Sequence, residues 1–269
     1  MHLVLTGATG LVGSGVLDAM IKMADVTKIS VLSRRPVAMA EAVNDPRVQV
    51  IIHKDFATYD KALMDQIRDA TGCVWAQGIS QNAVGKEEYV KITKEYPLAF
   101  ASAFNSAQSS LPEKKPFNFI YVSGDGTTLT PGALTPLFAR VKGETELALA
   151  QIRREVPTFR AESVRPSAVD PTDHEAIKPY IPVQGAGRDF LMGYLLRPAF
   201  RAGVLRSRWS PTQPLGVFLT EMAMGRWDEK TLGGKGVEKL EGGMLIVENS
   251  AFMRAAGLDA KKGKGKSEL

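Results

Sequence analysis

The sequence predicts an α/β fold, a doubly wound parallel sheet of the Rossmann type with a small C-terminal substrate cap. Two observations support this prediction. Short apolar, β-branched runs alternate with longer segments of helical periodicity through the first 165 residues, as in consecutive βαβ units. A glycine-rich loop also lies directly between the first apolar run and the first helical segment, which is where such folds place it.

The first part of the chain is expected to contain six strands and four helices. The strands are expected at His2–Thr6, Lys28–Ser33, Arg47–His53, Gly72–Gln77, Phe117–Ser123 and Arg160–Arg165. The helices are expected at Leu11–Met23, Tyr59–Ala70, Lys86–Ser106 and Pro136–Arg154. Thr135 is expected to cap the last helix, because threonine is a favoured N-cap and proline suits the first helical turn.

The pattern changes after Pro166. Proline-rich loops, helical segments at Arg188–Ala202 and Pro214–Arg226, and a late strand at Met244–Glu248 follow. The composition of Gly233–Gly243 predicts a flexible connector. We therefore expect one domain over residues 1–256, in which residues from about 167 to 243 add cap elements to the same core. Residues 257–269 are expected to form a flexible basic tail.

The cap segment is rich in large apolar side chains. Most of them should belong to the core and some should line a substrate pocket, which favours an apolar or aromatic substrate. They are Phe190, Met192, Tyr194, Phe200, Trp209, Phe218, Met222 and Met224.

Composition excludes several classes of protein. Cys73 is the only cysteine, so an internal disulfide framework is impossible. A strand expected to start at His2 leaves no room for a signal peptide. Both observations favour a cytoplasmic protein. The net charge of +5 includes a tail with four lysines against one glutamate, so we expect no nucleic-acid binding. Charges interrupt Phe190–Leu205, which excludes a membrane span, and the three histidines lack metal-ligand spacing, so no metal is expected.

The glycine loop has the sequence Thr6-Gly7-Ala8-Thr9-Gly10-Leu11-Val12-Gly13. Gly7 permits a tight turn, Gly10 lets backbone amides approach a pyrophosphate, and Gly13 lets the helix pack closely on the strand. Free N–H groups and the dipole of the following helix then face the phosphates. The loop therefore predicts that the chain binds a dinucleotide.

The end of the second strand indicates which dinucleotide is bound. An acidic residue at this position binds the ribose 2′-hydroxyl of NAD, whereas arginine accommodates the 2′-phosphate of NADP. The residues here are Ser33, Arg34 and Arg35. Because two guanidinium groups can form charge-assisted, bidentate bonds to phosphate, we expect NADP(H).

Further motifs follow the other strands, and together with the glycine loop they resemble the atypical short-chain dehydrogenases/reductases. These motifs are Asp55-Phe56, Trp75-Ala76-Gln77-Gly78, Tyr121-Val122-Ser123-Gly124, Lys142 and Val164-Arg165-Pro166. The resemblance is to the small epimerase-like group that includes the Tat-interacting reductase-like proteins, and it covers most of residues 1–256. It implies that Asp55 touches the adenine, that Gly78 borders the cofactor, and that the segment after Pro166 lies against the nicotinamide. The cofactor site then comprises Gly7, Thr9, Gly10, Leu11, Val12, Gly13, Ser33, Arg34, Arg35, Asp55, Phe56, Gly78, Lys142 and Pro166.

The resemblance also implies a catalytic serine, tyrosine and lysine, of which the tyrosine and lysine lie four residues apart on one helical face. Here Lys142 is retained and Phe138 occupies the tyrosine position. Phenylalanine cannot donate a proton, so the candidate catalytic residues are Lys142, Ser123 and Asp125.

Three functions are therefore open for this sequence. The first is NADPH-dependent reduction of a small carbonyl compound, with the proton relayed by Lys142, Ser123, Asp125 or a later residue such as His174 or Tyr180. The second is a non-redox isomerisation, dehydration or cyclisation on the same fold. The third is NADP sensing or partner binding, as in the NmrA-like regulators. The resemblance also allows a homodimer, but no residue pattern defines an interface.

Overall fold

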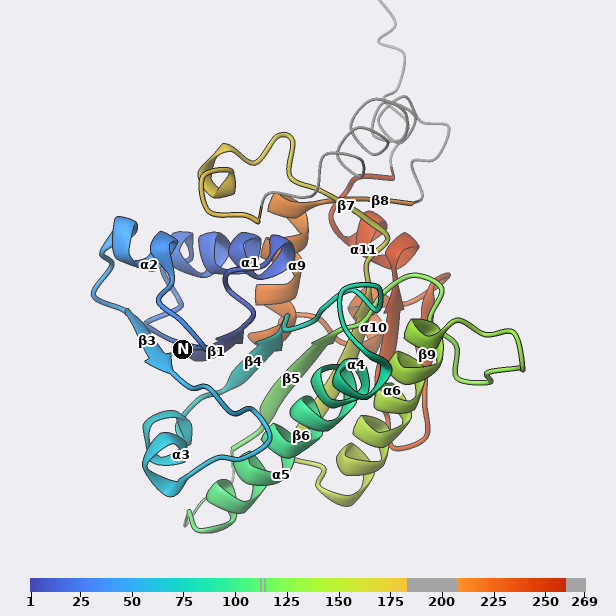
Figure 1. Ribbon diagram of the computed structural model, residues 1–269, viewed down its shortest axis with the longest axis horizontal. Coiled ribbons are helices and arrows are strands. Elements are labelled where there is room, and N and C mark those ends of the chain that lie inside the picture. Colours follow the sequence, from blue (N-terminus) through green and yellow to red (C-terminus); the bar gives the residue numbers. More distant parts are fainter. Residues whose placement is uncertain (112, 114, 183–207, 260–269) are drawn as a thin grey trace, which may run out of the picture.

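The protein contains an eight-stranded sheet with helices on both faces (Figure 1). The computed structural model describes residues 1–111, 113, 115–182 and 208–259. The strand order is β3-β2-β1-β4-β5-β6-β10-β9, and all neighbours are parallel except β10 and β9. β7 and β8 form a separate two-stranded parallel sheet. The predicted doubly wound parallel sheet is therefore confirmed.

The elements of the first part of the chain agree with the expected pattern, apart from a short helix at Ala38–Val43 that was not expected and the division of the helix expected at Lys86–Ser106. The strands are β1 (His2–Thr6), β2 (Lys28–Ser33), β3 (Val48–Ile52), β4 (Gly72–Trp75), β5 (Phe117–Val122), β6 (Phe159–Arg165), β7 (Ala168–Asp170), β8 (Trp209–Pro211), β9 (Val237–Lys239) and β10 (Leu245–Glu248). The α-helices are α1 (Leu11–Lys22), α2 (Ala38–Val43), α3 (Lys61–Ile67), α4 (Lys86–Val90), α5 (Tyr96–Ser109), α6 (Leu137–Glu155), α9 (Thr212–Ala223), α10 (Glu229–Leu232) and α11 (Asn249–Ala255). A π-helical turn, η1 (Lys91–Glu95), joins α4 to α5, and a 3₁₀ turn, η2 (Glu175–Ile177), follows β7.

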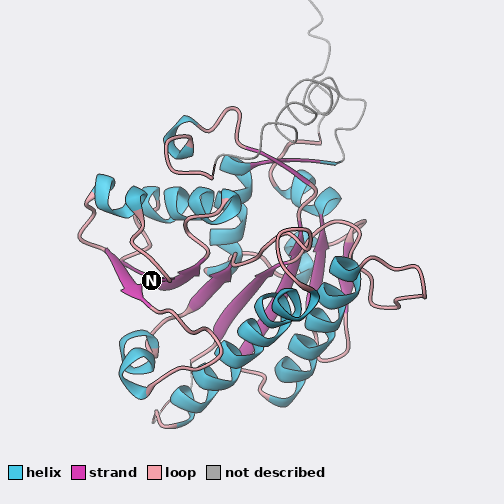
Figure 2. Ribbon diagram, in the orientation of Figure 1, coloured by secondary structure: helices cyan, strands magenta, loops and turns pink. Residues whose placement is uncertain are grey.

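Two apolar layers hold the helices on the sheet. Figure 2 shows the helices on either side of the strands. Successive strand residues point to opposite faces, so Leu3 and Leu5 pack beneath α1 and α9 whereas Val4 packs with α3, α5 and α6. α1 and α9 approach closely because both carry glycine at the contact: a Cβ atom on Gly216 would lie 2.2 Å from the carbonyl oxygen of Gly15. Helix α9 is thus part of the layer that supports the glycine loop.

Several elements differ from the expected ones. The helix expected at Lys86–Ser106 is divided into α4, η1 and α5. Pro136 occupies the N-cap position of α6, and the Thr135 hydroxyl accepts a hydrogen bond from the amide of Gly132, so Thr135 is not the cap. The expected connector at Gly233–Gly243 contains the edge strand β9, because its glycines allow the positive φ angles that its turns require.

Parts of the cap prediction lie outside the described residues. The helix expected at Arg188–Ala202 and most of the tail, residues 260–269, are among them. The helix expected at Pro214–Arg226 is α9, and the strand expected at Met244–Glu248 is β10, which joins the central sheet beside β6. None of the helices in the described part of the chain is long and apolar enough to cross a membrane.

The order of the strands determines where a ligand site can form. β1 pairs with β2 on one side and with β4 on the other. The chain therefore adds β2 and β3 on one side of β1 and then crosses to the other side to form β4. In open α/β sheets, this reversal opens a crevice at the carboxyl ends of the strands. The glycine loop follows β1 at this edge.

Candidate cofactor and substrate site

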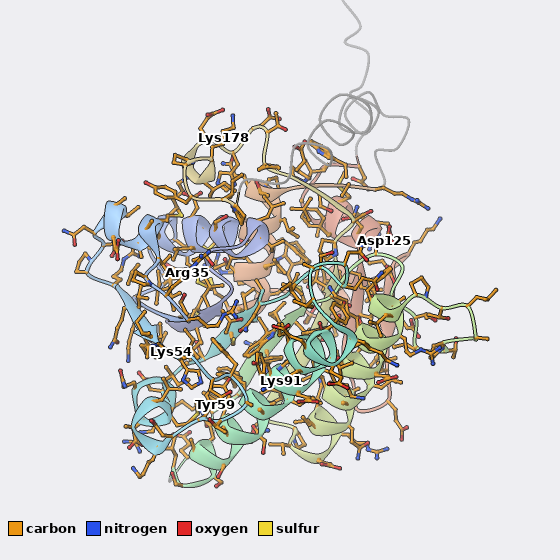
Figure 3. All side chains as sticks on the ribbon, in the orientation of Figure 1. Arg35, Lys54, Tyr59, Lys91, Asp125 and Lys178 are labelled. Carbon is orange, nitrogen blue, oxygen red and sulfur yellow. The ribbon has the colours of Figure 1, made fainter. Side chains whose placement is uncertain are left out.

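A continuous groove runs along the carboxyl ends of the central strands. It consists of two cavities of about 400 and 650 Å³, which share Gly10, Ala76, Gln77 and Gly78. We call the smaller one the arginine cavity, because Arg34 and Arg35 line it, and the larger one the lysine cavity, because Lys142 lines it. Figure 3 labels Arg35 and Asp125, which mark the two ends of the groove.

The glycine loop connects the two cavities, and two of its glycines are required by close backbone contacts. Gly7 has a φ of +73°, and a Cβ atom there would lie 2.4 Å from the carbonyl oxygen of Ala76. A Cβ atom on Gly13 would lie 2.1 Å from the carbonyl oxygen of Gly7. Gly10 is the N-cap of α1, no side chain caps this helix, and no acidic residue lies in its first turn. The free amides of the first turn therefore face the groove, where they can bind an anion.

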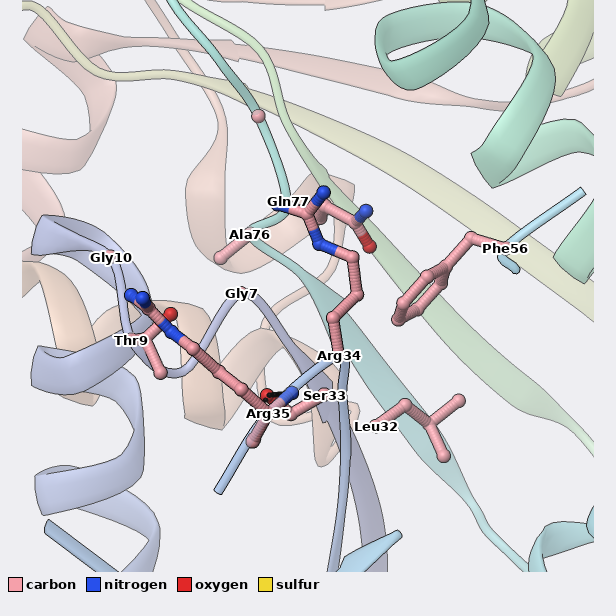
Figure 4. A pocket seen from close by; sticks show the side chains of 11 residues that line it. Gly7, Thr9, Gly10, Leu32, Ser33, Arg34, Arg35, Phe56, Ala76 and Gln77 are labelled. Carbon is pink, nitrogen blue, oxygen red and sulfur yellow. Dashed lines mark hydrogen bonds between the residues drawn. The ribbon is translucent and has the colours of Figure 1, made fainter. Parts of the chain in front are cut away.

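The arginine cavity has two guanidinium groups at the end of β2. Among the described residues, neither Arg34 nor Arg35 has an ion-pair partner. The side chain of Arg35 extends toward the glycine loop and that of Arg34 toward Gln77 (Figure 4). The Ser33 hydroxyl donates a hydrogen bond to the carbonyl oxygen of Arg35 at 2.7 Å, which fixes the turn that directs these arginines.

One buried polar atom in this cavity has no partner. Oε1 of Gln77 is buried and accepts no hydrogen bond from any described residue. Because a buried acceptor is costly to leave unsatisfied, this atom fits a ligand that supplies a donor, such as a ribose hydroxyl. Gln77 lines both cavities, and the sequence had indicated it only as part of a motif.

Asp55 and Phe56, both expected to contact the cofactor, have different environments. Phe56 is buried and lines the arginine cavity. Asp55 does not line it: its carboxylate accepts hydrogen bonds from the amide of Ala57 at 3.0 Å and the hydroxyl of Thr58 at 3.1 Å. These bonds hold the pKa of Asp55 below its usual value. Asp55 therefore shapes the turn that presents Phe56.

Lys142 is the cation of the lysine cavity. Its Nζ donates a hydrogen bond to the carbonyl oxygen of Ser123 at 2.6 Å. The loop after β5 can reach α6 because Gly143 has no side chain: a Cβ atom there would lie 1.9 Å from the carbonyl oxygen of Thr128. Burial lowers the pKa of Lys142 to about 8, and the charge of Glu146 partly opposes this shift. A lysine with this pKa can exchange its proton near neutral pH.

The structure brings Ser123 and Asp125 to the same cavity but gives them different partners. The Ser123 and Thr127 hydroxyls are both buried and are hydrogen-bonded to each other at 3.2 Å. Asp125 is exposed at the mouth of the cavity, where its carboxylate accepts a hydrogen bond from the Ser167 hydroxyl at 2.9 Å. Ser123 is thus placed beside Lys142, whereas Asp125 belongs to the rim.

Phe138 also lines the lysine cavity, one helical turn before Lys142. Its amide donates a hydrogen bond at 2.8 Å to the side-chain carbonyl oxygen of Gln81, which comes from the loop after β4. The tip of its ring lies 3.6 Å from the position of a Cβ atom on Gly126. The aromatic ring therefore takes part in the cavity wall without a hydroxyl group.

A buried ion-pair network lies one turn further along α6. Glu146 is fully buried and accepts hydrogen bonds from the Ser163 hydroxyl at 2.7 Å and from Nε and Nη2 of Arg165 at 3.0 and 2.5 Å. Nη1 of Arg165 donates to Glu248 at 2.8 Å. The sequence had indicated Arg165 alone, because nothing in the local pattern distinguishes Glu146 from a solvent-exposed helical glutamate.

His174 and three of the cap residues pack inside the protein, away from the groove. His174 is buried outside the groove, where Nε2 contacts Asp18 at 2.9 Å and Nδ1 contacts Thr212 at 3.0 Å, so it ties the loop after β7 to α1 and α9. Phe218, Met222 and Met224 pack in the core. Phe190, Met192, Tyr194 and Phe200 lie outside the described residues. Across the described ranges, no group of three or more His, Cys, Asp and Glu side chains could hold a metal ion.

Two curated proteins of fungal biosynthetic clusters are similar to the chain. Leucinostatins biosynthesis cluster protein T of Purpureocillium lilacinum is 32% identical over 256 residues, which cover 88% of this chain and 90% of that protein. Botcinic acid biosynthesis cluster B protein 16 of Botryotinia fuckeliana is 48% identical over 142 residues, 53% of this chain and 87% of that protein. No protein-family model matches the chain.

Solved structures share the fold. An oxidoreductase of the short-chain dehydrogenase/reductase family from Burkholderia thailandensis has a TM-score of 0.60 at 14% identity, covering 93% of this chain and 92% of that chain. A 3-oxoacyl-[acyl-carrier protein] reductase from Brucella melitensis, in complex with NAD, has a TM-score of 0.60 at 16% identity, covering 97% and 98%. The expected likeness to short-chain dehydrogenases/reductases is confirmed for the fold.

Proposed function

Because the chain belongs to the family of leucinostatins biosynthesis cluster protein T and has the short-chain dehydrogenase/reductase fold, we propose that it is an NADP(H)-dependent oxidoreductase. Its substrate is a small carbonyl compound, and Lys142 takes the place of the usual tyrosine as the proton donor. When bound, the cofactor supplies or accepts the hydride.

The observation that supports this proposal best is the continuity of the groove. It starts at two arginines with no described ion-pair partner, passes the free amides at the start of α1, and ends at Lys142. The arginines match a 2′-phosphate and the amides match a pyrophosphate. Lys142 and Ser123 then lie at the nicotinamide end, where a substrate carbonyl would be reduced.

The lining of the lysine cavity combines apolar and polar side chains, which suits a small organic substrate with an apolar part. Seven of the apolar side chains are larger than alanine. They are Leu11, Val12, Ile79, Val122, Phe138, Pro166 and Val169. The Ser123 hydroxyl can hold the carbonyl oxygen, and the Lys142 ammonium can deliver a proton to it as negative charge develops.

Cofactor choice is tested by titrating the purified protein with NADPH and NADH. We expect tighter binding of NADPH, and we expect Arg34→Ala and Arg35→Ala each to weaken NADPH binding about tenfold without changing NADH binding, because each removes a charge-assisted bond to phosphate. Nicotinamide fluorescence gives both dissociation constants. Arg160→Ala, an exposed arginine of β6 outside the groove, is the matched control.

The same titration distinguishes the alternatives. Equal affinity for NADH and NADPH in the wild type and in Arg34→Ala contradicts the assignment of the arginines to the 2′-phosphate. Tight NADPH binding without reduction of any compound in a panel of apolar ketones and enones favours the non-redox enzyme. A protein that binds a partner only when loaded with NADPH favours the regulatory function.

The position of Phe138 is tested by Phe138→Tyr. The new phenol would lie at the cavity wall, one turn from Lys142, so the usual tyrosine–lysine pair would be restored. We expect turnover of simple ketones to rise at least about tenfold, since a positioned general acid contributes roughly 100-fold or more. Phe138→Leu controls for a change in cavity shape. An equal response to tyrosine and leucine would mean that residue 138 is not at the proton-donor position.

A further inference from the structure

The charge environment of Lys142 is determined by a small number of buried groups. Lys142 and Glu146 lie four residues apart, so they occupy the same face of α6 on successive turns. Glu146 is completely buried, and Ser163 and Arg165 donate three hydrogen bonds to its carboxylate. The negative charge of Glu146 is therefore fixed in place beside the lysine cavity, with little screening by water.

Arg165 brings a positive charge to the same place. Its side chain is 6% exposed, and it bridges Glu146 on α6 to Glu248 at the end of β10. Together Glu146, Arg165 and Glu248 have a net charge of −1. A protonated Lys142 makes the whole cluster neutral, so loss of that proton leaves an unbalanced charge inside the protein.

We propose that Glu146 is a positioning residue that favours the ammonium form of Lys142, and that Arg165 acts through Glu146 by keeping its buried carboxylate charged. This inference rests on the proposed function for its catalytic meaning only. Burial pulls Lys142 toward the neutral amine, and the cluster restores a substantial ammonium fraction at neutral pH. A lysine that must donate a proton and recover it needs this balance.

The other groups around Lys142 add little fixed charge. Tyr121 of β5 also lines the cavity, and burial raises its pKa, as it does for Tyr89 of α4, so both phenols are neutral. Asp125 in the loop after β5 is exposed at the cavity mouth and is screened by solvent. Glu144 of α6 is paired with Lys94 of η1 at 2.7 Å and is 41% exposed. Glu146 is thus the buried carboxylate that faces Lys142 most directly.

The test measures the pKa of Lys142 in the cofactor-free protein by NMR of lysine labelled with ¹³C at Cε. The signal of Lys142 is identified by its loss in Lys142→Arg. We expect Glu146→Gln to lower this pKa by about one unit, because it removes the nearby negative charge. Arg165→Gln should also lower it, because the buried Glu146 carboxylate loses its counter-charge and takes up a proton. Glu144→Gln, from the same helix, is expected to change it by less than about 0.3 units.

A lower pKa of Lys142 in both variants supports the proposal. A pKa in Glu146→Gln within about 0.3 units of the wild type, or a higher pKa in Arg165→Gln, overturns it. Because no cofactor or substrate is present, these results do not depend on whether the protein is a reductase. If it is one, the pH profile of turnover moves in the same direction as the pKa.

Glu146→Gln leaves Arg165 buried with one carboxylate fewer and could fail to fold. Glu248→Gln is then the deciding variant, because Glu248 is 35% exposed and the Glu146–Arg165 pair stays intact. It makes the cluster more positive from a greater distance, so the pKa of Lys142 should fall by a smaller amount, about 0.5 units. A rise or no change in this variant overturns the proposal.

Discussion

Gly13→Ala is expected to abolish useful cofactor binding, with a rise of at least about 100-fold in the dissociation constant for NADPH. The new Cβ atom would lie 2.1 Å from the oxygen and 2.5 Å from the carbon of the Gly7 carbonyl, and both are backbone atoms that cannot rotate away. The start of α1 must therefore move away from the glycine loop. The free amides would then no longer converge on one pyrophosphate.

Fluorescence titration with NADPH and thermal unfolding without cofactor should be measured together for this variant. Gly132→Ala is the matched control, because Gly132 lies in an exposed loop and a Cβ atom there meets nothing within 4 Å. We expect the control to bind NADPH as the wild type does. If Gly13→Ala folds and still binds NADPH within threefold of the wild type, the glycine loop is not the pyrophosphate site.

The sequence could predict the glycine loop because its requirements are local. Gly7 needs a positive φ for its turn, and Gly13 meets the Gly7 carbonyl within the same loop; Gly7 also meets Ala76 and Gln77, which directly follow β4. The strands could be predicted equally well, since a continuous apolar run such as Leu3, Val4 and Leu5, all fully buried, is typical of a strand between two helix layers. Fold class and the outline of the groove therefore follow from short-range patterns.

The rest of the site depends on contacts between distant segments. Gln81 binds the amide of Phe138 across 57 residues, and Arg165 meets Glu248 across 83 residues. A buried glutamate such as Glu146 has the same helical spacing as an exposed one, so its burial appears only when α6 is packed on β6. The contact of Asp55 with the adenine stays a prediction, and the structure adds that its carboxylate accepts hydrogen bonds from Ala57 and Thr58 of its own turn.

The C-terminal part was hard to predict for a related reason. A strand was expected at Met244–Glu248, but the position of β10 beside β6 is decided by strand pairing and not by its own residues. The glycines of Gly233–Gly243 indicate a flexible connector, but this segment contains β9, which pairs with β10. Glycine gives the freedom to turn, and the neighbouring strand decides whether the segment is ordered.

Lys142→Met is expected to lower turnover about 1,000-fold while the dissociation constant for NADPH changes by less than about fivefold. Methionine keeps most of the volume of the lysine stem but removes the group that would protonate the substrate oxygen. Cofactor affinity should be largely retained, because the arginines and the glycine-loop amides are the anion-binding groups of the groove. Lys94→Met is the matched control, since Nζ of Lys94 binds Glu144 at 2.7 Å.

The pH dependence of turnover tests the same role of Lys142. Lys142 must be protonated to act as a donor, so kcat/KM for reduction should be constant at low pH and fall as pH rises through about 8, the pKa to which burial lowers it. Oxidation of the corresponding alcohol needs the neutral amine, and its rate should fall as pH decreases through the same value. Both pH limbs should disappear in Lys142→Met. A variant that keeps turnover within threefold of the wild type would assign the proton transfer to another group, and Ser123 with its partner Thr127 would then be the next to replace.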